Sequence, residues 1–330
     1  MTRVTADISV VICAYTFERW NDLIEAVASV QQQTTLPREI IVVIDHNPAL
    51  AAQVRAHLAD VSVIENREAR GLSGARNSGI AVAQGAAIAF MDEDAVAASD
   101  WLERLAAGFD EPEIIGVGGA IEPFWLSSRP NWFPEEFDWV VGCTYRGMPL
   151  TSTSVRNLIG CNMSFKREVF EVVGGFRTGI GRVGTRPVGC EETELCIRVG
   201  QHWRNKALRY EPGAKVRHRV TASRSTWRYF RSRCYAEGLS KALVAQFVGP
   251  NEALQSERVY TLRTLPSGVV RNLKDLLLAG DSTGLLRALA IVAGLIFTTA
   301  GYARGICLER LGPRVKAVKG ITTFRGEPGQ

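Results

Sequence analysis

Short apolar runs rich in β-branched residues recur through the first hundred residues, and segments with helical spacing separate them. Runs of this kind are typical of buried parallel strands. Strands that alternate with helices form βαβ units around a parallel sheet. The predicted strands are 8–14, 39–44, 61–65 and 86–91, and the predicted helices are 20–33, 49–58 and 73–84. The chain is therefore expected to be an α/β protein with a single, mostly parallel sheet flanked by helices.

The middle of the chain is less regular. Glycine-rich, strand-like segments flank a loop that holds Trp125, Trp132 and Trp139 together with three prolines. Exposed aromatic rings stack on sugars or apolar chains, but tryptophan is also an ordinary core residue. We favour a loop that faces the substrate. The later predicted elements are strands 114–121, 158–165, 207–210 and 214–220, and helices 167–173 and 193–199.

Charge divides the chain into two unequal parts. Residues 1–200 hold 17 Lys or Arg and 26 Asp or Glu, whereas residues 201–330 hold 22 and 8. A basic C-terminal part indicates an anionic neighbour, namely phospholipid, nucleic acid or a phosphorylated substrate, and a merely solvated basic face is the alternative. The seven cysteines form no CxxC pair. We therefore expect free thiols in a reducing compartment and a cytoplasmic protein.

The residues after 226 are helical, basic and amphipathic. The apolar stretch 285–303 lies near Arg287 and Arg304, so its uninterrupted part is shorter than the ~20 residues that a spanning helix needs. We predict a buried or interfacial helix there. The segment 269–278 would suit a membrane surface, which predicts peripheral contact with the inner face of the cell membrane.

Carboxylates follow two of the predicted strands. In open α/β sheets, ligands bind beyond the carboxyl ends of the strands. Asp45, Asp92 and the turn Ala14-Tyr15-Thr16 all lie there. The triplet Asp92-Glu93-Asp94 is either a site for a hard cation such as Mg²⁺ or Mn²⁺, or a solvated acidic turn before the next helix.

Other candidate residues are ambiguous when they are taken singly. Glu191 and Glu192 open a short helix, where one of them would serve as a general base or both would simply complement the helix dipole. Arg76 belongs to a glycine-containing helix start at 70–77, which is a weak phosphate signal. His218 lies among basic residues and is either structural or a neutral metal ligand.

Taken together, the order and spacing of these motifs resemble the inverting family 2 glycosyltransferases, which have the GT-A fold. The resemblance covers roughly residues 8–220. The motifs that carry it are Val10-Val11-Ile12-Cys13-Ala14-Tyr15, the run from Ile40 to Asp45, Gly71 to Gly79, Phe90-Met91-Asp92-Glu93-Asp94, Gly174-Gly175-Phe176, and Glu191 to Arg198.

The resemblance implies a role for each matching position. The catalytic base would be Glu192, with Glu191 beside it as the alternative. The donor-binding residues would be Ala14, Tyr15, Thr16, Glu18, Asp45, Arg76, Asp92 and Glu93. The ligands of a Mn²⁺ or Mg²⁺ cofactor would be Asp94, Asp92 and His218, and the acceptor-binding residues would be Trp125, Trp132 and Asn162.

Two departures from the family pattern stand at functional positions. Cys13 replaces the usual proline, and Glu192 replaces the usual catalytic aspartate. The longer Glu side chain leaves the choice between Glu191 and Glu192 open.

The resemblance also implies the organisation and the reaction. A GT-A catalytic domain would occupy residues 1–222, with a nucleotide-sugar half at 1–115 and an acceptor half at 116–222. Residues 223–330 would form a basic helical extension. The expected activity is single-displacement transfer of a sugar from a nucleotide-diphosphate donor, UDP above all, to a glycan or lipid-linked acceptor. An inactive GT-A-like scaffold that binds a partner or an anionic surface is the alternative, and no nucleic acid is expected as a partner.

Overall fold

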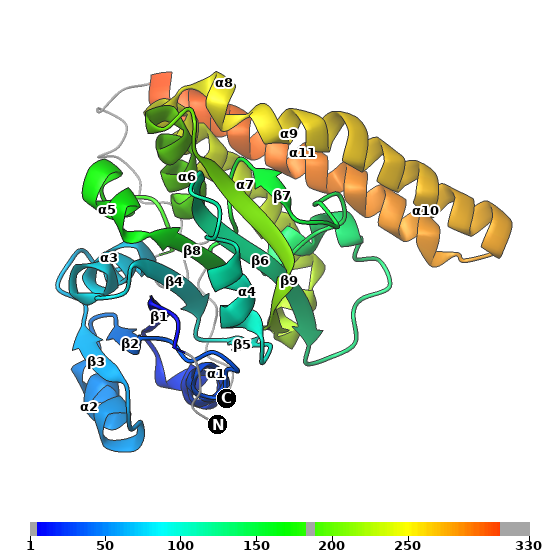
Figure 1. The fold of residues 1–330 in the computed structure, drawn as a ribbon. Helices are drawn as coiled ribbons and strands as arrows, with labels where there is room; N and C mark the ends of the chain where they lie inside the picture. The colour runs from blue at the N-terminus through cyan, green and yellow to red at the C-terminus, as the bar shows by residue number, and fades with distance from the viewer. Residues whose placement is uncertain (1–4, 183–188, 311–330) are drawn as a thin grey trace.

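The computed structural model describes residues 5–182 and 189–310, and it consists of one mixed sheet with helices on both faces (Figure 1). Over the described residues the sheet has nine strands in the order β3-β2-β1-β4-β8-β6-β9-β5, and β7 pairs with β9. The strands are β1 (Ile8–Ala14), β2 (Glu39–Ile44), β3 (Ser62–Glu65), β4 (Ala87–Asp92), β5 (Ala95–Ala97), β6 (Ile114–Trp125), β7 (Thr153–Val155), β8 (Asn162–Lys166) and β9 (Ala207–Val220).

The helices fall into two groups along the chain, before and after the end of β9. The helices of residues 5–222 are α1 (Trp20–Gln31), α2 (Pro48–His57), α3 (Leu72–Val82), α4 (Trp101–Ala107), α5 (Arg167–Val173) and α6 (Glu191–His202). Those of the C-terminal part are α7 (Trp227–Val248), α8 (Pro250–Ala253), α9 (Gln255–Val259), α10 (Leu265–Ala279) and α11 (Thr283–Arg310). Shorter turns of helix are η1 (Phe17–Arg19), η2 (Glu135–Val141), η3 (Ala222–Ser225) and the π-helical η4 (Tyr260–Thr264).

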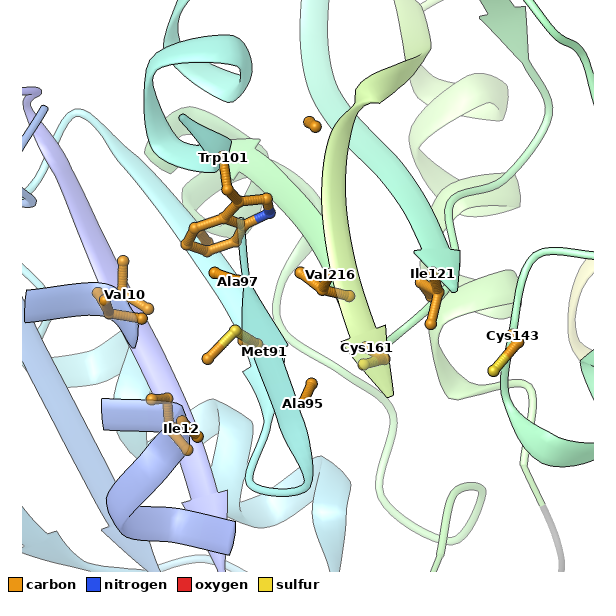
Figure 2. Packing of buried hydrophobic residues seen from close by; sticks show 14 of the residues in the cluster. Val10, Ile12, Met91, Ala95, Ala97, Trp101, Ile121, Cys143, Cys161 and Val216 are labelled. Atoms are coloured by element: carbon orange, nitrogen blue, oxygen red, sulfur yellow. The ribbon is translucent and has the colours of Figure 1, made fainter. Parts of the chain in front are cut away.

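The strands β3-β2-β1-β4 pair in parallel, as the apolar runs predict. Alternate residues of these strands enter two cores. Val10 and Ile12 pack with α1, α2 and Trp101 on one face, and Val11 packs with α3, α5 and α6 on the other. Figure 2 shows part of the first core around Trp101. Burial on both faces explains why these strands are almost continuously apolar.

The second half of the sheet is mixed rather than mostly parallel. β8 runs antiparallel to β4 and β6, and β9 runs parallel to β6 but antiparallel to β5 and β7. The two strand segments predicted at 207–210 and 214–220 are one strand, β9. Because β8 reverses direction, its first residues lie beside the carboxyl end of β4, where Asp92 stands.

The C-terminal helices α7 to α11 pack against one another and against the part of the chain before residue 223. In α7, a Cβ atom added to Gly238 would lie 2.0 Å from the carbonyl oxygen of Thr298 in α11, so the two backbones touch. From there α10 and α11 run side by side as a hairpin that projects from the body of the molecule (Figure 1). Arg271 of α10 forms a 2.7 Å ion pair with the buried Glu136 of η2. The predicted boundary at residue 222 lies within η3, between β9 and α7.

The segment Thr283–Leu308 of α11 is long and apolar enough to cross a membrane by length and composition, and 33% of its most apolar window is buried against the protein. The predicted apolar stretch at 285–303 lies within this segment.

Candidate active site

A cavity of about 640 Å³ opens at the carboxyl ends of β1 and β4. Three parts of the chain line it: the strand ends of the nucleotide half, the N-terminus of α6, and the C-terminal helices. Most of the residues predicted from sequence to form the site are brought together here. The predicted residues that line the cavity are Ala14, Tyr15, Asp45, Arg76, Asp92, Glu93, Asp94, Glu191 and Glu192.

The negative charge of Asp92-Glu93-Asp94 at the end of β4 is partly neutralised by Arg19, a residue that was not predicted to belong to the site. The Nη1 atom of Arg19 lies 2.7 Å from both Glu93 Oε1 and Asp94 Oδ2. Burial, with Asp94 close by, raises the pKa of Glu93 to about 7. Burial also favours the neutral form of Asp94, but His218, Arg19 and Arg224 overcome it and hold the pKa of Asp94 well below its usual range. Asp94 therefore remains a carboxylate at neutral pH, and Glu93 holds its proton more readily.

Arg76 connects the two acidic groups of the site. This guanidinium is 2% exposed, and it contacts Asp92 at 3.3 Å and Glu191 at 2.9 Å. It also donates a hydrogen bond of 3.0 Å to the backbone oxygen of Gly160. Arg76 therefore neutralises Glu191 and fixes the start of α6 against the end of β4.

Unlike Glu191, Glu192 forms no ion pair with any residue that the structure describes, although the positive charge of Arg76 still acts on it. Its side chain is half-buried and lines the cavity. Burial, reinforced by the negative charge of Glu191, raises the pKa of Glu192 to about 7. A carboxylate with a pKa near the working pH is suited to general base catalysis. The geometry therefore distinguishes the two glutamates, since Glu191 is paired with Arg76 and Glu192 has a raised pKa.

The backbone before these glutamates is held by α7. Cys190 adopts a left-handed conformation with φ of +73°, which is uncommon for a residue other than glycine. Its thiol lies 3.2 Å from Glu237 Oε1, and the backbone N–H of Gly189 donates to Ser240 Oγ at 3.1 Å. The C-terminal part thus takes part in setting the position of α6.

Two of the metal ligands predicted from sequence, Asp92 and His218, come together with Cys161 at the end of β4, and the third, Asp94, lies beside His218. Asp92, Cys161 and His218 each offer a ligand atom, and these atoms lie within 4.8 Å of one another. Asp94 Oδ1 is buried without a hydrogen-bond donor and lies 3.1 Å from His218 Nε2. An under-used carboxylate oxygen beside an imidazole nitrogen fits a divalent cation.

At the far end of the nucleotide half, Asp45 is 8% exposed and accepts hydrogen bonds from Gly71 N at 2.9 Å and from Asn66 Nδ2 at 2.6 Å. These bonds orient the carboxylate toward the cavity wall. Thr16 and Glu18 do not line the cavity. Thr16 instead caps η1, where its Oγ1 accepts from the N–H of Glu18 at 3.3 Å.

The structure does not bring the predicted acceptor residues Trp125, Trp132 and Asn162 to the cavity. Trp125 packs edge-on against Phe133, and Trp132 packs against Phe133, Trp227 and Phe230. These rings pack against one another in an aromatic cluster that includes two residues of α7, Trp227 and Phe230.

Asn162 is fully buried at the start of β8, where its amide is fully used. It accepts from the indole of Trp101 at 2.8 Å and donates to the carbonyl oxygens of Ala120 and Ala214. The side chains that line the cavity on the acceptor side are Trp139, Tyr145 and Arg156, with Lys241, Leu262, Leu265 and Tyr302 from the C-terminal helices. The basic, amphipathic sequence after residue 226 predicts that its helices bury one face. It does not predict that this face lines the cavity.

Residues 9–174 match the family described as glycosyl transferase family 2. The glucosyl-dolichyl phosphate glucuronosyltransferase of Haloferax volcanii is 34% identical over 311 residues, which cover 92% of this chain and 97% of that protein. The pre-mycofactocin glycosyltransferase of Mycobacterium tuberculosis is 27% identical over 183 residues, or 54% of this chain and 37% of that one.

Among solved structures, a mannosyltransferase from Pyrobaculum calidifontis in complex with GDP-Man and Mn²⁺ superposes with a TM-score of 0.57. The two proteins are 16% identical, and the match covers 93% of this chain and 87% of the other. At this identity the match establishes a shared fold.

Proposed function

Since this chain belongs to glycosyl transferase family 2, we propose that it transfers a sugar from a UDP-sugar to a hydroxyl group of a lipid-linked glycan, with inversion at the anomeric carbon. It is a glycosyltransferase with the GT-A fold. One observation carries the proposal. A single cavity joins the nucleotide end at Asp45, the carboxylates around Arg76, and a glutamate, Glu192, that is suited to accept a proton.

The reaction needs one base and no covalent intermediate. The acceptor oxygen attacks the anomeric carbon as the bond to the donor's diphosphate breaks, and the nucleoside diphosphate leaves with the electron pair. The hydroxyl proton passes to Glu192. Attack on the face opposite the leaving group inverts the anomeric centre.

The leaving diphosphate must be met by positive charge. Mn²⁺ or Mg²⁺, held by Asp92, Asp94 and His218, would supply that charge when bound. Arg182 and Arg233 also line the cavity and add cations from outside the acidic cluster. Arg233 is itself paired with Glu237 at 3.9 Å, and Arg19 and Arg76 are paired with carboxylates of the acidic cluster.

The acceptor is proposed to be a sugar on a polyprenyl phosphate of the dolichyl type. The name of the Haloferax relative motivates this choice, since the alignment with it includes the C-terminal helices. Leu262 of η4 supports it as well, because this side chain lines the cavity and is 75% exposed. An apolar residue at the cavity mouth would let a lipid chain leave the cavity without entering water.

The α10–α11 hairpin is proposed to lie on the membrane surface. Its exposed apolar side chains are Val270, Leu277, Leu278, Leu285, Leu286, Leu289, Val292 and Ile296. On α11 the residues 285, 289, 292 and 296 repeat at helical spacing and form one stripe. The opposite side of α11 is occupied by protein, since Ala288, Ala290 and Ile291 are buried and a Cβ added to Gly294 would meet Phe137 at 2.3 Å. A helix with one apolar face outward and the other against protein suits the membrane interface rather than a span.

The test is transfer from a panel of labelled nucleotide sugars, with UDP-glucuronate first, to glucosyl polyprenyl phosphate in vesicles. We expect product with one UDP-sugar in the presence of Mn²⁺ or Mg²⁺, and at least ~100-fold slower product formation by Asp94→Asn or Glu192→Gln. The exposed Glu168→Gln is the matched control and should retain activity. Binding of UDP without transfer or donor hydrolysis under any condition would favour the scaffold alternative.

A further inference from the structure

A cysteine thiol stands among the oxygen and nitrogen donors of the proposed metal site. Cys161 is 4% exposed, lines the cavity, and offers its Sγ within 4.8 Å of ligand atoms of Asp92 and His218. Thiolates favour Zn²⁺ and other thiophilic ions, whereas Mg²⁺ and Mn²⁺ favour oxygen. The site therefore combines a thiol, which favours thiophilic ions, with a carboxylate, which favours Mg²⁺ and Mn²⁺.

The sheet topology explains how three distant segments meet. β8 runs antiparallel to β4 with Met91 opposite Asn162, so Cys161, one residue earlier, lies beside Asp92. β5 pairs with β9 with Ala95 opposite His218, which brings the imidazole to the residue next to Asp94. Strand pairing thus places Asp92 and His218, and Cys161 lies in the turn that leads directly into β8.

A second observation points to a cation at the same place. Asp94 Oδ1 belongs to a side chain that is 3% exposed, has no hydrogen-bond donor, and lies 3.1 Å from His218 Nε2. On the other side of the imidazole, Cys143 Sγ lies 3.8 Å from Nδ1. Nε2 is therefore the ring nitrogen that would bind a metal ion held beside Asp94, and Nδ1, which faces Cys143, is the nitrogen that would keep the ring proton in the metal-bound form.

We propose that Cys161 is a metal ligand of this site and that the site therefore binds Zn²⁺ or Cd²⁺ in competition with Mn²⁺ or Mg²⁺. On binding, the S–H bond breaks, a sulfur–metal bond forms, and the proton goes to water. The inference deepens the proposed function, because the same site is proposed to hold the cation used in transfer. It makes the enzyme sensitive to thiophilic ions, which would occupy the site and keep it from Mn²⁺.

The experiment is a titration of the full-length, reduced, metal-free protein with Cd²⁺, followed by the ultraviolet charge-transfer absorption of the cadmium–thiolate bond. Cys307 is exposed and would bind Cd²⁺ on its own, so it is replaced by serine in every sample. We expect the band to saturate at one equivalent, and we expect Cys161→Ser and Cys161→Ala to abolish it. Cys234→Ser is the matched control, since this free thiol is also buried but does not line the cavity, and its loss should not change the band.

Competition with Mn²⁺ tests the same point in the unchanged site. Excess Mn²⁺ should reduce the band if both ions share the site. A band that survives in both Cys161 variants, or no band in the parent protein, would overturn the inference, as would a band that Mn²⁺ leaves unchanged. The band does not depend on transfer. Loss of the band with intact transfer would refute only the thiol ligand, and a band without transfer would refute only the proposed function.

Discussion

Replacing Glu191 and Glu192 one at a time should distinguish the residue that accepts the proton from the residue that pairs with Arg76. Glu192→Gln keeps the shape of the side chain but removes its ability to take a proton. Glu191→Gln removes one partner of Arg76, which keeps its contact with Asp92. The two changes are matched in chemistry and adjacent in sequence, so a difference between them reports on role.

The expected magnitudes follow from the site. A positioned general base contributes roughly 10²–10⁴-fold to rate, or about 3–5 kcal/mol of activation free energy. We expect Glu192→Gln to lower kcat and kcat/KM by that factor, with the KM for the donor nearly unchanged. The negative charge of Glu191 helps to raise the pKa of Glu192, so Glu191→Gln should lower this pKa and cost less than ~10-fold in kcat at pH 8.

The assay is the pH dependence of kcat/KM. The active form of Glu192 is the carboxylate, so the rate should rise tenfold per pH unit below about 7 and level off above it. In Glu191→Gln the plateau should begin at lower pH. The reasoning is refuted if Glu191→Gln is the more damaging change, or if the profile of the parent enzyme is flat through pH 7.

Three further changes test other parts of the structure. Arg76→Leu leaves Asp92 and Glu191 without their shared cation and should lower the free energy of unfolding by about 3–5 kcal/mol, measured by urea denaturation. Asn162→Leu strips the Trp101 indole and two carbonyl groups of their partners, at ~1–3 kcal/mol for each buried group left unpaired. Thermal melting should show this loss, and a raised KM for the acceptor instead would return Asn162 to the acceptor site. The double change Leu277→Glu and Leu278→Glu should weaken binding to anionic vesicles at least ~100-fold without lowering the melting temperature, because these side chains are 79% and 84% exposed. Leu150→Glu, at a position that is 92% exposed and outside the hairpin, is its control, and equal vesicle binding by both would argue against a membrane-facing hairpin.

The nucleotide half could be predicted closely because its signals are local. The runs at 8–14 and 39–44 become strands with these same bounds, since β-branched residues buried on both faces leave little other choice. Asp45 and Asp92 meet the cavity because parallel strands end at one edge of the sheet. The pairing of Glu191 with Arg76, over more than a hundred residues of chain, was not predicted, since the family resemblance assigned Arg76 to the nucleotide donor.

The rest depended on contacts that no local pattern records. The direction of β8 is set by its neighbours β4 and β6, so the mixed half of the sheet was not predicted. A tryptophan-rich loop looks alike whether its rings face a sugar or one another, and Trp132 meets Trp227 and Phe230, which come about a hundred residues later. Arg19 gave no signal because its carboxylate partners lie in a different βαβ unit.

The contribution of the C-terminal helices to the cavity has a consequence for biosynthesis. A ribosome that has translated 250 residues has already made Asp45, Arg76, Asp94 and Glu192, and domains fold from the N-terminus as the chain emerges. The wall that includes Leu265, Leu295 and Tyr302 is still missing at that stage. The nascent chain therefore contains the carboxylates of the site before the acceptor side of the cavity exists. The complete cavity forms only when α11 has left the ribosome.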